Sequence, residues 1–109
     1  MYSVLVVDDE IRQREAIIKS VNWEKAGFKV AGDAENGIEA LELLEKLEPD
    51  LILTDIKMPL MTGLELARKA REIRPATKLV ILSGYDDFEY AQEAFKYNVI
   101  RYLLKPISA

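Results

Sequence analysis

The chain has 109 residues, a formal net charge of −4, and neither cysteine nor histidine. This length suits one domain, and with 50% of its residues apolar the chain can build a hydrophobic core. Without cysteine, disulfide bonds, thiolate catalysis and cysteine-based zinc sites are excluded, and without histidine any imidazole chemistry must come from a partner.

The charge and the lengths of the apolar segments also bear on partners and location. A negative domain is poorly suited to bind nucleic acid directly, because phosphate-binding faces are usually basic. No segment reaches the ~18 apolar residues of a membrane helix. The apolar run at 4–7 is too short and too quickly followed by acidic residues for a signal peptide. We therefore expect a cytoplasmic protein without a membrane partner.

Strand and helix patterns alternate along the chain without a linker or a low-complexity stretch. Short apolar runs predict strands that are buried on both faces of a sheet. Apolar residues at helical spacing lie between these runs, as is typical of βα units around a parallel sheet. The predicted strands are 4–7, 28–31, 51–54, 79–82 and 100–104.

The first predicted helix follows the strand at 4–7. Its apolar stripe is rough and consists of Ile11, Ala16, Ile17 and Val21. The segment closes at Trp23 and Gly27. The next strand, 28–31, is less apolar than the others, which favours a position at the edge of the sheet.

The second and third predicted helices have clear boundaries. The second begins at Asn36 and Gly37 and is stopped by Pro49. The third covers 63–73 and is ended by Pro75.

The fourth predicted helix begins at Asp86. Glu89 follows three residues later, in a pattern typical of a capping box. Because capping accounts for Asp86 and its neighbour Asp87, we assign neither of them to a metal. The inner face of this helix is predicted to hold Phe88, Ala91 and Phe95.

Charged residues directly follow three of the predicted strands. Asp8 and Asp9 follow the first strand, Asp55 the third and Lys105 the fifth. In parallel sheets the ligand crevice lies beyond the carboxyl ends of the strands, so we expect these groups to converge. Clustered carboxylates repel one another unless a cation lies among them, and Mg²⁺, which prefers oxygen ligands, suits that need. Lys105 would add a positive charge for an incoming anion.

Each of these residues also has a simpler interpretation. An Asp-Asp pair after a strand is often a helix N-cap. A lone aspartate such as Asp55 is often a turn residue, and Lys105 alone could be a surface lysine. The combination of all four residues favours a binding site over three unrelated roles.

Four segments, in order, resemble the receiver domain of bacterial two-component response regulators. They are Val-Asp-Asp-Glu at 7–10, Thr-Asp-Ile-Lys-Met-Pro at 54–59, Leu-Ser-Gly at 82–84 and Tyr-Leu-Leu-Lys-Pro at 102–106. The resemblance implies a flavodoxin-like α/β fold, a doubly wound five-stranded parallel sheet with strand order 2-1-3-4-5. Residues 1–109 would form one receiver domain that ends before or at the fifth helix. We expect the face left uncovered to be apolar and to favour association.

The resemblance also implies phosphoryl transfer from the phosphohistidine of a sensor histidine kinase. Asp55 would be the phosphoacceptor, because a carboxylate oxygen can attack phosphorus. Asp9 would bind Mg²⁺ directly and Asp8 mostly through a water, and Asp55 and the backbone carbonyl of Lys57 would complete the protein ligands. Lys105 would neutralise charge on the moving phosphoryl group. The domain would catalyse only its own phosphorylation and dephosphorylation and would not be an enzyme for other substrates.

Four further roles follow from the resemblance. Ser83 would hydrogen-bond the new phosphoryl group, and Tyr102 would fill the space that Ser83 vacates. This change would bias the face formed by the fourth helix and fifth strand, which is a candidate homodimer surface. Lys57 and Tyr85 would border the route of water to the acyl phosphate and so modulate its lifetime.

The segments 83–91 and 23–28 look like those of receivers attached to AraC-type helix-turn-helix transcription factors. DNA contact would then require an output domain outside this chain.

Three other interpretations stay open. A haloacid-dehalogenase-type phosphatase normally carries a second aspartate where this chain has Lys57. A flavodoxin-like binding module would have a Ser-, Thr- and Gly-rich loop in place of the acidic residues after the first strand. A receiver could also act as a scaffold that is independent of phosphorylation.

Overall fold

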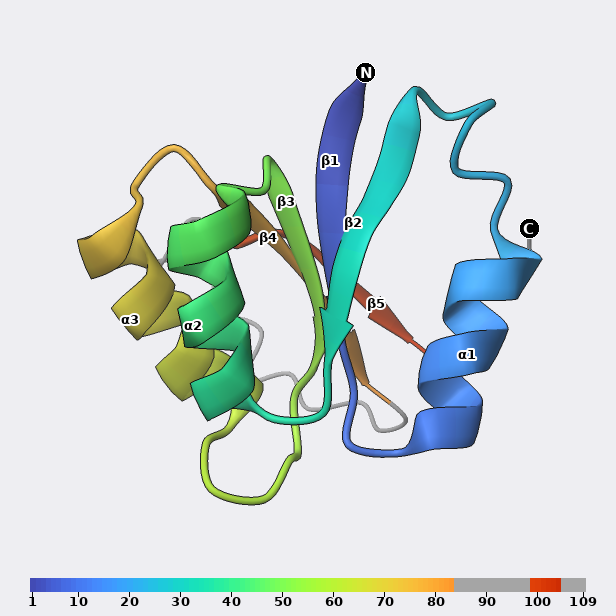
Figure 1. The fold of residues 1–109 in the computed structure, drawn as a ribbon. Coiled ribbons are helices and arrows are strands. Elements are labelled where there is room, and N and C mark those ends of the chain that lie inside the picture. The colour runs from blue at the N-terminus through green and yellow to red at the C-terminus, as the bar shows by residue number, and fades with distance from the viewer. Residues whose placement is uncertain (84–98, 105–109) are drawn as a thin grey trace.

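The computed structural model describes residues 1–83 and 99–104. A five-stranded sheet forms the middle layer, with α2 and α3 on one face and α1 on the other (Figure 1). The strand order is β2-β1-β3-β4-β5, and every neighbouring pair is parallel. The predicted doubly wound α/β fold and its strand order are confirmed.

The observed elements follow the predicted ones closely. The third helix has the predicted bounds, while the edge strand at Phe28 continues three residues further than expected, to Ala34. The fourth predicted helix, from Asp86, lies outside the described residues. The elements are β1 (Tyr2–Val7), α1 (Ile11–Ser20), β2 (Phe28–Ala34), α2 (Gly37–Leu47), β3 (Leu51–Asp55), α3 (Gly63–Ile73), β4 (Lys78–Ser83) and β5 (Val99–Leu104).

The sheet carries a hydrophobic core on each face. Because successive residues of a strand point to opposite faces, an unbroken apolar strand serves both cores. The larger core lies toward α2 and α3 and includes Leu5, Ile52, Ile81, Leu44 and Ala67. Among the described side chains, the smaller core, on the face of α1, consists of Val4, Leu53, Val80 and Leu82, with Ile17 packed against it.

Helix α1 differs from its predicted apolar stripe. Ile11 is 59% exposed, Ala16 is also exposed, and no residue of the helix is fully buried. The prediction was wrong at Ile11 and Ala16. The inward face of the helix includes Arg14, and a charged residue on that face interrupts the apolar spacing from which the face was predicted. The half-buried positions are Gln13, Arg14, Ile17, Ile18 and, just past the helix, Val21.

An aromatic group packs where α1 leads into β2. The Trp23 ring meets the Phe28 ring edge-on at a centroid distance of 6.4 Å, and its Nε1–H donates to the Ile18 carbonyl oxygen at 3.2 Å. The Tyr2 ring also packs against Phe28, with a distance of 5.8 Å between the ring centroids. These residues lie at the amino ends of the strands.

Among the described residues no helix is long and apolar enough to cross a membrane.

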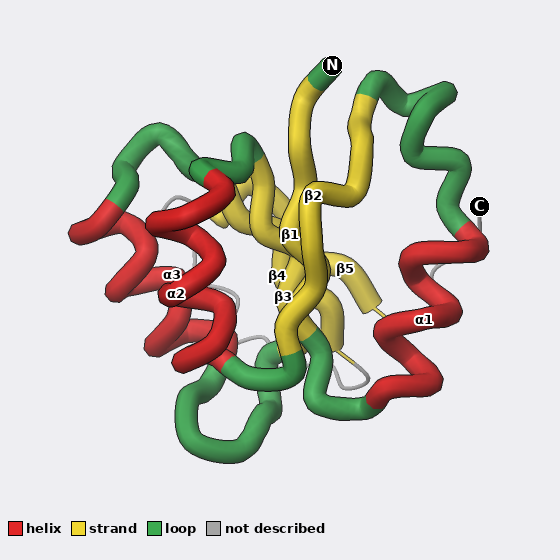
Figure 2. Tube along the Cα trace, viewed as in Figure 1, coloured by secondary structure: helices red, strands yellow, loops and turns green. Residues whose placement is uncertain are grey.

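The loops that follow β1, β2 and β3 lie together at the opposite end of the sheet (Figure 2). The β3–α3 loop is tightly constrained. The Gly63 N–H donates to the Ile56 carbonyl oxygen at 2.7 Å, and Leu60 adopts the left-handed conformation, with φ 72°. Thr62 and Glu65 form a capping box at the start of α3. The loop therefore holds the end of β3 in a fixed place.

Candidate functional site

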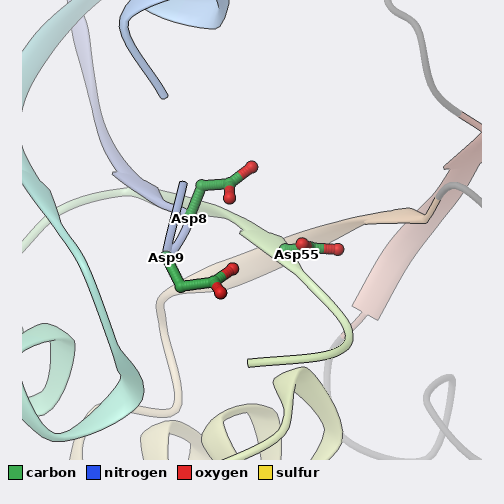
Figure 3. Close-up of side chains that lie close together, drawn as sticks. All are labelled: Asp8, Asp9 and Asp55. Atoms are coloured by element: carbon green, nitrogen blue, oxygen red, sulfur yellow. The ribbon is translucent and has the colours of Figure 1, made fainter. Parts of the chain in front are cut away.

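Three carboxylates meet at the carboxyl ends of β1 and β3. Asp8 and Asp9 follow β1, and Asp55 is the last residue of β3, the strand beside β1. Each offers an oxygen, and these oxygens lie within 4.8 Å of one another (Figure 3). Neighbouring parallel strands bring the residues that follow them to the same edge of the sheet. The structure thus brings together three of the four charged groups that the sequence placed at strand ends.

Asp8 is the most buried member of this acidic cluster, with 1% of its surface exposed. Its N–H donates to the Ala34 carbonyl oxygen at 3.1 Å, and its Oδ1 accepts from the Glu10 N–H at 3.0 Å. Helix α1 begins after Glu10, whose own side chain makes no capping hydrogen bond. The Asp8 carboxylate thus shapes the turn before α1 and is not the N-cap of that helix.

Asp9 and Asp55 are more open than Asp8. Asp9 is exposed and Asp55 is half-buried. The Ile56 N–H donates to Asp55 Oδ1 at 2.8 Å, which orients the carboxylate at the end of the strand. The cluster therefore has a buried wall formed by Asp8 and an open side at Asp9.

The donor set suits Mg²⁺. All of the clustered ligand atoms are carboxylate oxygens, the class that hard divalent cations prefer. Mg²⁺ keeps several waters, and the exposed side at Asp9 leaves room for them. Three carboxylates at this separation also need a positive charge to offset their repulsion. The residues present fit the predicted cation.

Arg14 is a neighbour of the site that the sequence analysis missed. Its Nε donates to Asp33 Oδ2 at 2.6 Å in an ion pair, and its Nη1 donates to the Asp8 carbonyl oxygen at 2.7 Å. Only 12% of the Arg14 side chain is exposed. The signal that could have found it is its spacing, three residues before Ile17 on the inward stripe of α1.

The other predicted site residues are placed less completely. Lys57 is exposed in the β3–α3 loop, two residues after Asp55. Ser83 is described only through its backbone, as the residue of β4 that follows the partner of Asp55 in the sheet. Tyr102 is likewise described as a backbone position in β5, paired with Ile81. Tyr85, Asp86, Asp87 and Lys105 lie outside the described residues.

The strand order is that of the flavodoxin-like α/β fold, and the carboxylate cluster lies beyond β1 and β3. This combination of fold and acidic site is the one expected of a receiver domain. Residues 4–109 match the family described as the response regulator receiver domain, and the chain belongs to that family.

Known relatives agree with this assignment. The chain is 43% identical over 106 residues to the uncharacterized transcriptional regulatory protein YesN of Bacillus subtilis, covering 97% of this chain and 29% of YesN. The REC domain of AraT, a response regulator from Geobacillus stearothermophilus, superposes with a TM-score of 0.89 at 43% identity, covering 98% of this chain and 83% of that one. A two component transcriptional regulator AraC from Clostridium phytofermentans gives 0.88 at 37% identity, with 99% and 84% covered. The chain thus spans less than a third of the length of YesN.

Proposed function

We propose that this receiver domain accepts a phosphoryl group on Asp55 from the phosphohistidine of a sensor histidine kinase, with Mg²⁺ bound beside it. The observation that carries the proposal is the convergence of Asp8, Asp9 and Asp55 within 4.8 Å at the carboxyl ends of adjacent strands. Membership of the receiver family supports it. A carboxylate that is only a turn residue would not need two acidic neighbours from another strand.

The proposed reaction is a displacement at phosphorus. An oxygen of the Asp55 carboxylate forms a bond to phosphorus while the bond between phosphorus and the donor imidazole nitrogen breaks, and the electron pair leaves with that nitrogen. The hydrogen bond from the Ile56 N–H orients the Asp55 carboxylate, whose half-buried position leaves it within reach of a donor. When bound, Mg²⁺ supplies positive charge for the phosphoryl oxygens.

The remaining residues have proposed roles around that step. Asp9 would be a direct ligand and Asp8 would act through a water, with Asp55 and the Lys57 carbonyl as further ligands. Lys105 would pair with the phosphoryl oxygens. Ser83 would hydrogen-bond the phosphoryl group and Tyr102 would move with it, which would change the face of the fourth helix and fifth strand.

The output is proposed to be control of transcription. YesN is named a transcriptional regulatory protein, and this chain matches 29% of its length. One similar structure is a two component transcriptional regulator AraC. DNA binding would then belong to a separate output domain, and this acidic domain would control it.

The test is phosphorylation by a small phosphoryl donor, followed by intact-mass spectrometry. Acetyl phosphate or phosphoramidate with Mg²⁺ should add one phosphoryl group to the parent and none to Asp55→Asn, because an amide is a far poorer nucleophile than a carboxylate. Asp50→Asn is the matched control, since Asp50 directly precedes the amino end of the same strand. It should be labelled as the parent is. Equal labelling of Asp55→Asn and the parent would refute the assignment, and an unlabelled parent would favour the scaffold interpretation.

A further inference from the structure

Arg14 connects three elements at the acidic end of the sheet. From α1 its guanidinium donates to the Asp8 carbonyl oxygen after β1, and it forms an ion pair with Asp33 of β2. The two bonds use different nitrogens, Nη1 and Nε, at 2.7 and 2.6 Å. The side chain is 12% exposed, so it sits under the surface of the domain and does not extend into solvent.

These two interactions, together with a backbone hydrogen bond, connect Asp8 to the end of β2. The Asp8 N–H donates to the carbonyl oxygen of Ala34, which directly follows Asp33 in β2. The Asp8 carbonyl is held by Arg14, and Arg14 is held by Asp33. Both backbone polar groups of Asp8 are therefore tied to the end of β2, one directly and one through the guanidinium.

The Asp8 carbonyl belongs to the peptide unit that joins Asp8 to Asp9. A peptide unit is planar, so a bond to its oxygen fixes the orientation of the whole plane. The orientation of that plane contributes to the direction of the Asp9 carboxylate relative to the carboxylates of Asp8 and Asp55. We infer that Arg14, braced by Asp33, is a positioning residue that sets the Asp8–Asp9 peptide so that both carboxylates face the Mg²⁺ site. This inference rests on the proposed function.

Arginine suits this task better than lysine. A planar guanidinium donates in fixed directions from several nitrogens, whereas an ammonium group is a point charge on a flexible stem. Asp33 also cancels the charge of Arg14, so the brace adds no net positive charge beside a cation site. A brace that fixes the ligands of a metal typically changes metal affinity when it is lost.

Electrostatics alone predicts the opposite result for a simple deletion. Loss of the Arg14 charge would leave Asp33 unpaired and would favour Mg²⁺ at long range. Two variants keep the net charge of the pair unchanged and so isolate the geometry. They are Arg14→Lys and the double variant Arg14→Met with Asp33→Asn. Arg12→Lys is the matched control, because Arg12 is exposed on the same helix.

The experiment measures Mg²⁺ binding by isothermal titration calorimetry at constant ionic strength, with folding checked by circular dichroism in EDTA. We expect both charge-conserving variants to fold and to bind Mg²⁺ about tenfold more weakly than the parent, while Arg12→Lys binds as the parent does. A purely structural role would lower the unfolding midpoint in EDTA and leave the Mg²⁺ dissociation constant unchanged. If Arg14→Lys does not fold, the double variant decides.

Asp9→Ala distinguishes an error in the proposed Mg²⁺ site from an error in the proposed role of Arg14. If it binds Mg²⁺ as tightly as the parent, the proposed metal site itself is wrong. If Asp9→Ala loses binding while the folded charge-conserving variants keep the parental dissociation constant, only the role of Arg14 is overturned. Weaker binding in those variants, with normal binding in Arg12→Lys, supports the positioning role.

Discussion

Gly63 and Asp55 are in backbone contact: a Cβ atom added to Gly63 would lie 2.5 Å from the Asp55 carbonyl oxygen and 3.0 Å from the Ile56 Cα. Real Cβ atoms essentially never come within 3.0 Å of another heavy atom, so the 2.5 Å approach to the Asp55 oxygen would force the backbone to move. The first residue of α3 therefore rests directly against the end of β3. Any side chain at position 63 would push the helix away from the proposed phosphoacceptor.

Gly63→Ala should thus affect both stability and the site. We expect a loss of about 1–3 kcal/mol in the free energy of unfolding, because the atoms that the new Cβ would meet are backbone atoms of Asp55 and Ile56, which cannot rotate away as a side chain can. Phosphorylation by acetyl phosphate should slow as well. Gly32→Ala is the control, since its new Cβ would meet mainly the end of the Leu47 side chain, which can move. Urea denaturation measures the first effect, and equal stability of the two variants would contradict the expectation.

The two aspartates after β1 should separate in their effects. Asp9 is exposed and its proposed role is that of a direct ligand, so Asp9→Ala should weaken Mg²⁺ binding more than Asp8→Ala. Asp8 is 1% exposed and accepts the Glu10 N–H, so Asp8→Ala removes both this hydrogen bond and the least solvent-screened charge of the cluster, and should change the stability in EDTA more than Asp9→Ala does. Calorimetric titration compares the Mg²⁺ affinities of the two variants, and thermal unfolding in EDTA compares their stabilities. A larger loss of Mg²⁺ affinity in Asp8→Ala would reverse the assigned roles.

The buried hydroxyl of Thr77, just before β4, lies at the end of the sheet opposite the acidic cluster and should affect stability but not phosphorylation. Thr77 is fully buried, donates to the Pro49 carbonyl oxygen at 2.7 Å and accepts from Arg74 Nη1 at 2.7 Å. Thr77→Val should cost about 1 kcal/mol or more in unfolding free energy, because it removes both bonds at constant volume. The rate and extent of phosphorylation should match those of the parent. Impaired phosphorylation in a folded Thr77→Val protein would show coupling between the two ends of the sheet.

The lifetime of the phosphorylated state is predicted to depend on Lys57 and Tyr85. Neither side chain can orient an attacking water as a carboxylate or amide can, and Lys57 can pair with phosphoryl oxygens. We therefore expect slow hydrolysis in the parent and faster decay in the double variant Lys57→Asn with Tyr85→Ala. Decay is followed after donor removal with Mg²⁺ present. An unchanged or slower rate in the double variant would show that these side chains do not shield the phosphoryl group.

Much of the fold could be predicted because its strands are continuous apolar runs. β3 and β4 were located to within one residue at each end, and the acidic cluster follows from residues that stand next to those runs. The stripe of α1 was predicted less well, since Arg14 is held in an inward position by Asp8, which follows β1, and by Asp33 of β2. Those partners lie six and nineteen residues away along the chain, and no local period reveals them. The contact of Gly63 with Asp55 likewise depends on how the loop closes, which spacing does not show.

The packing of Trp23 against Phe28 gives the domain a built-in optical probe. Trp23 is the only tryptophan in the sequence, and it packs against Phe28, the first residue of β2, whereas the carboxylates lie at the carboxyl ends of β1 and β3. Its emission should report unfolding without direct quenching by a cation at the acidic cluster. A change of that emission upon phosphorylation would mean that the conformational change reaches the amino ends of the strands, because the Trp23 ring contacts Phe28 and its N–H donates to Ile18, and neither of these residues belongs to the acidic cluster.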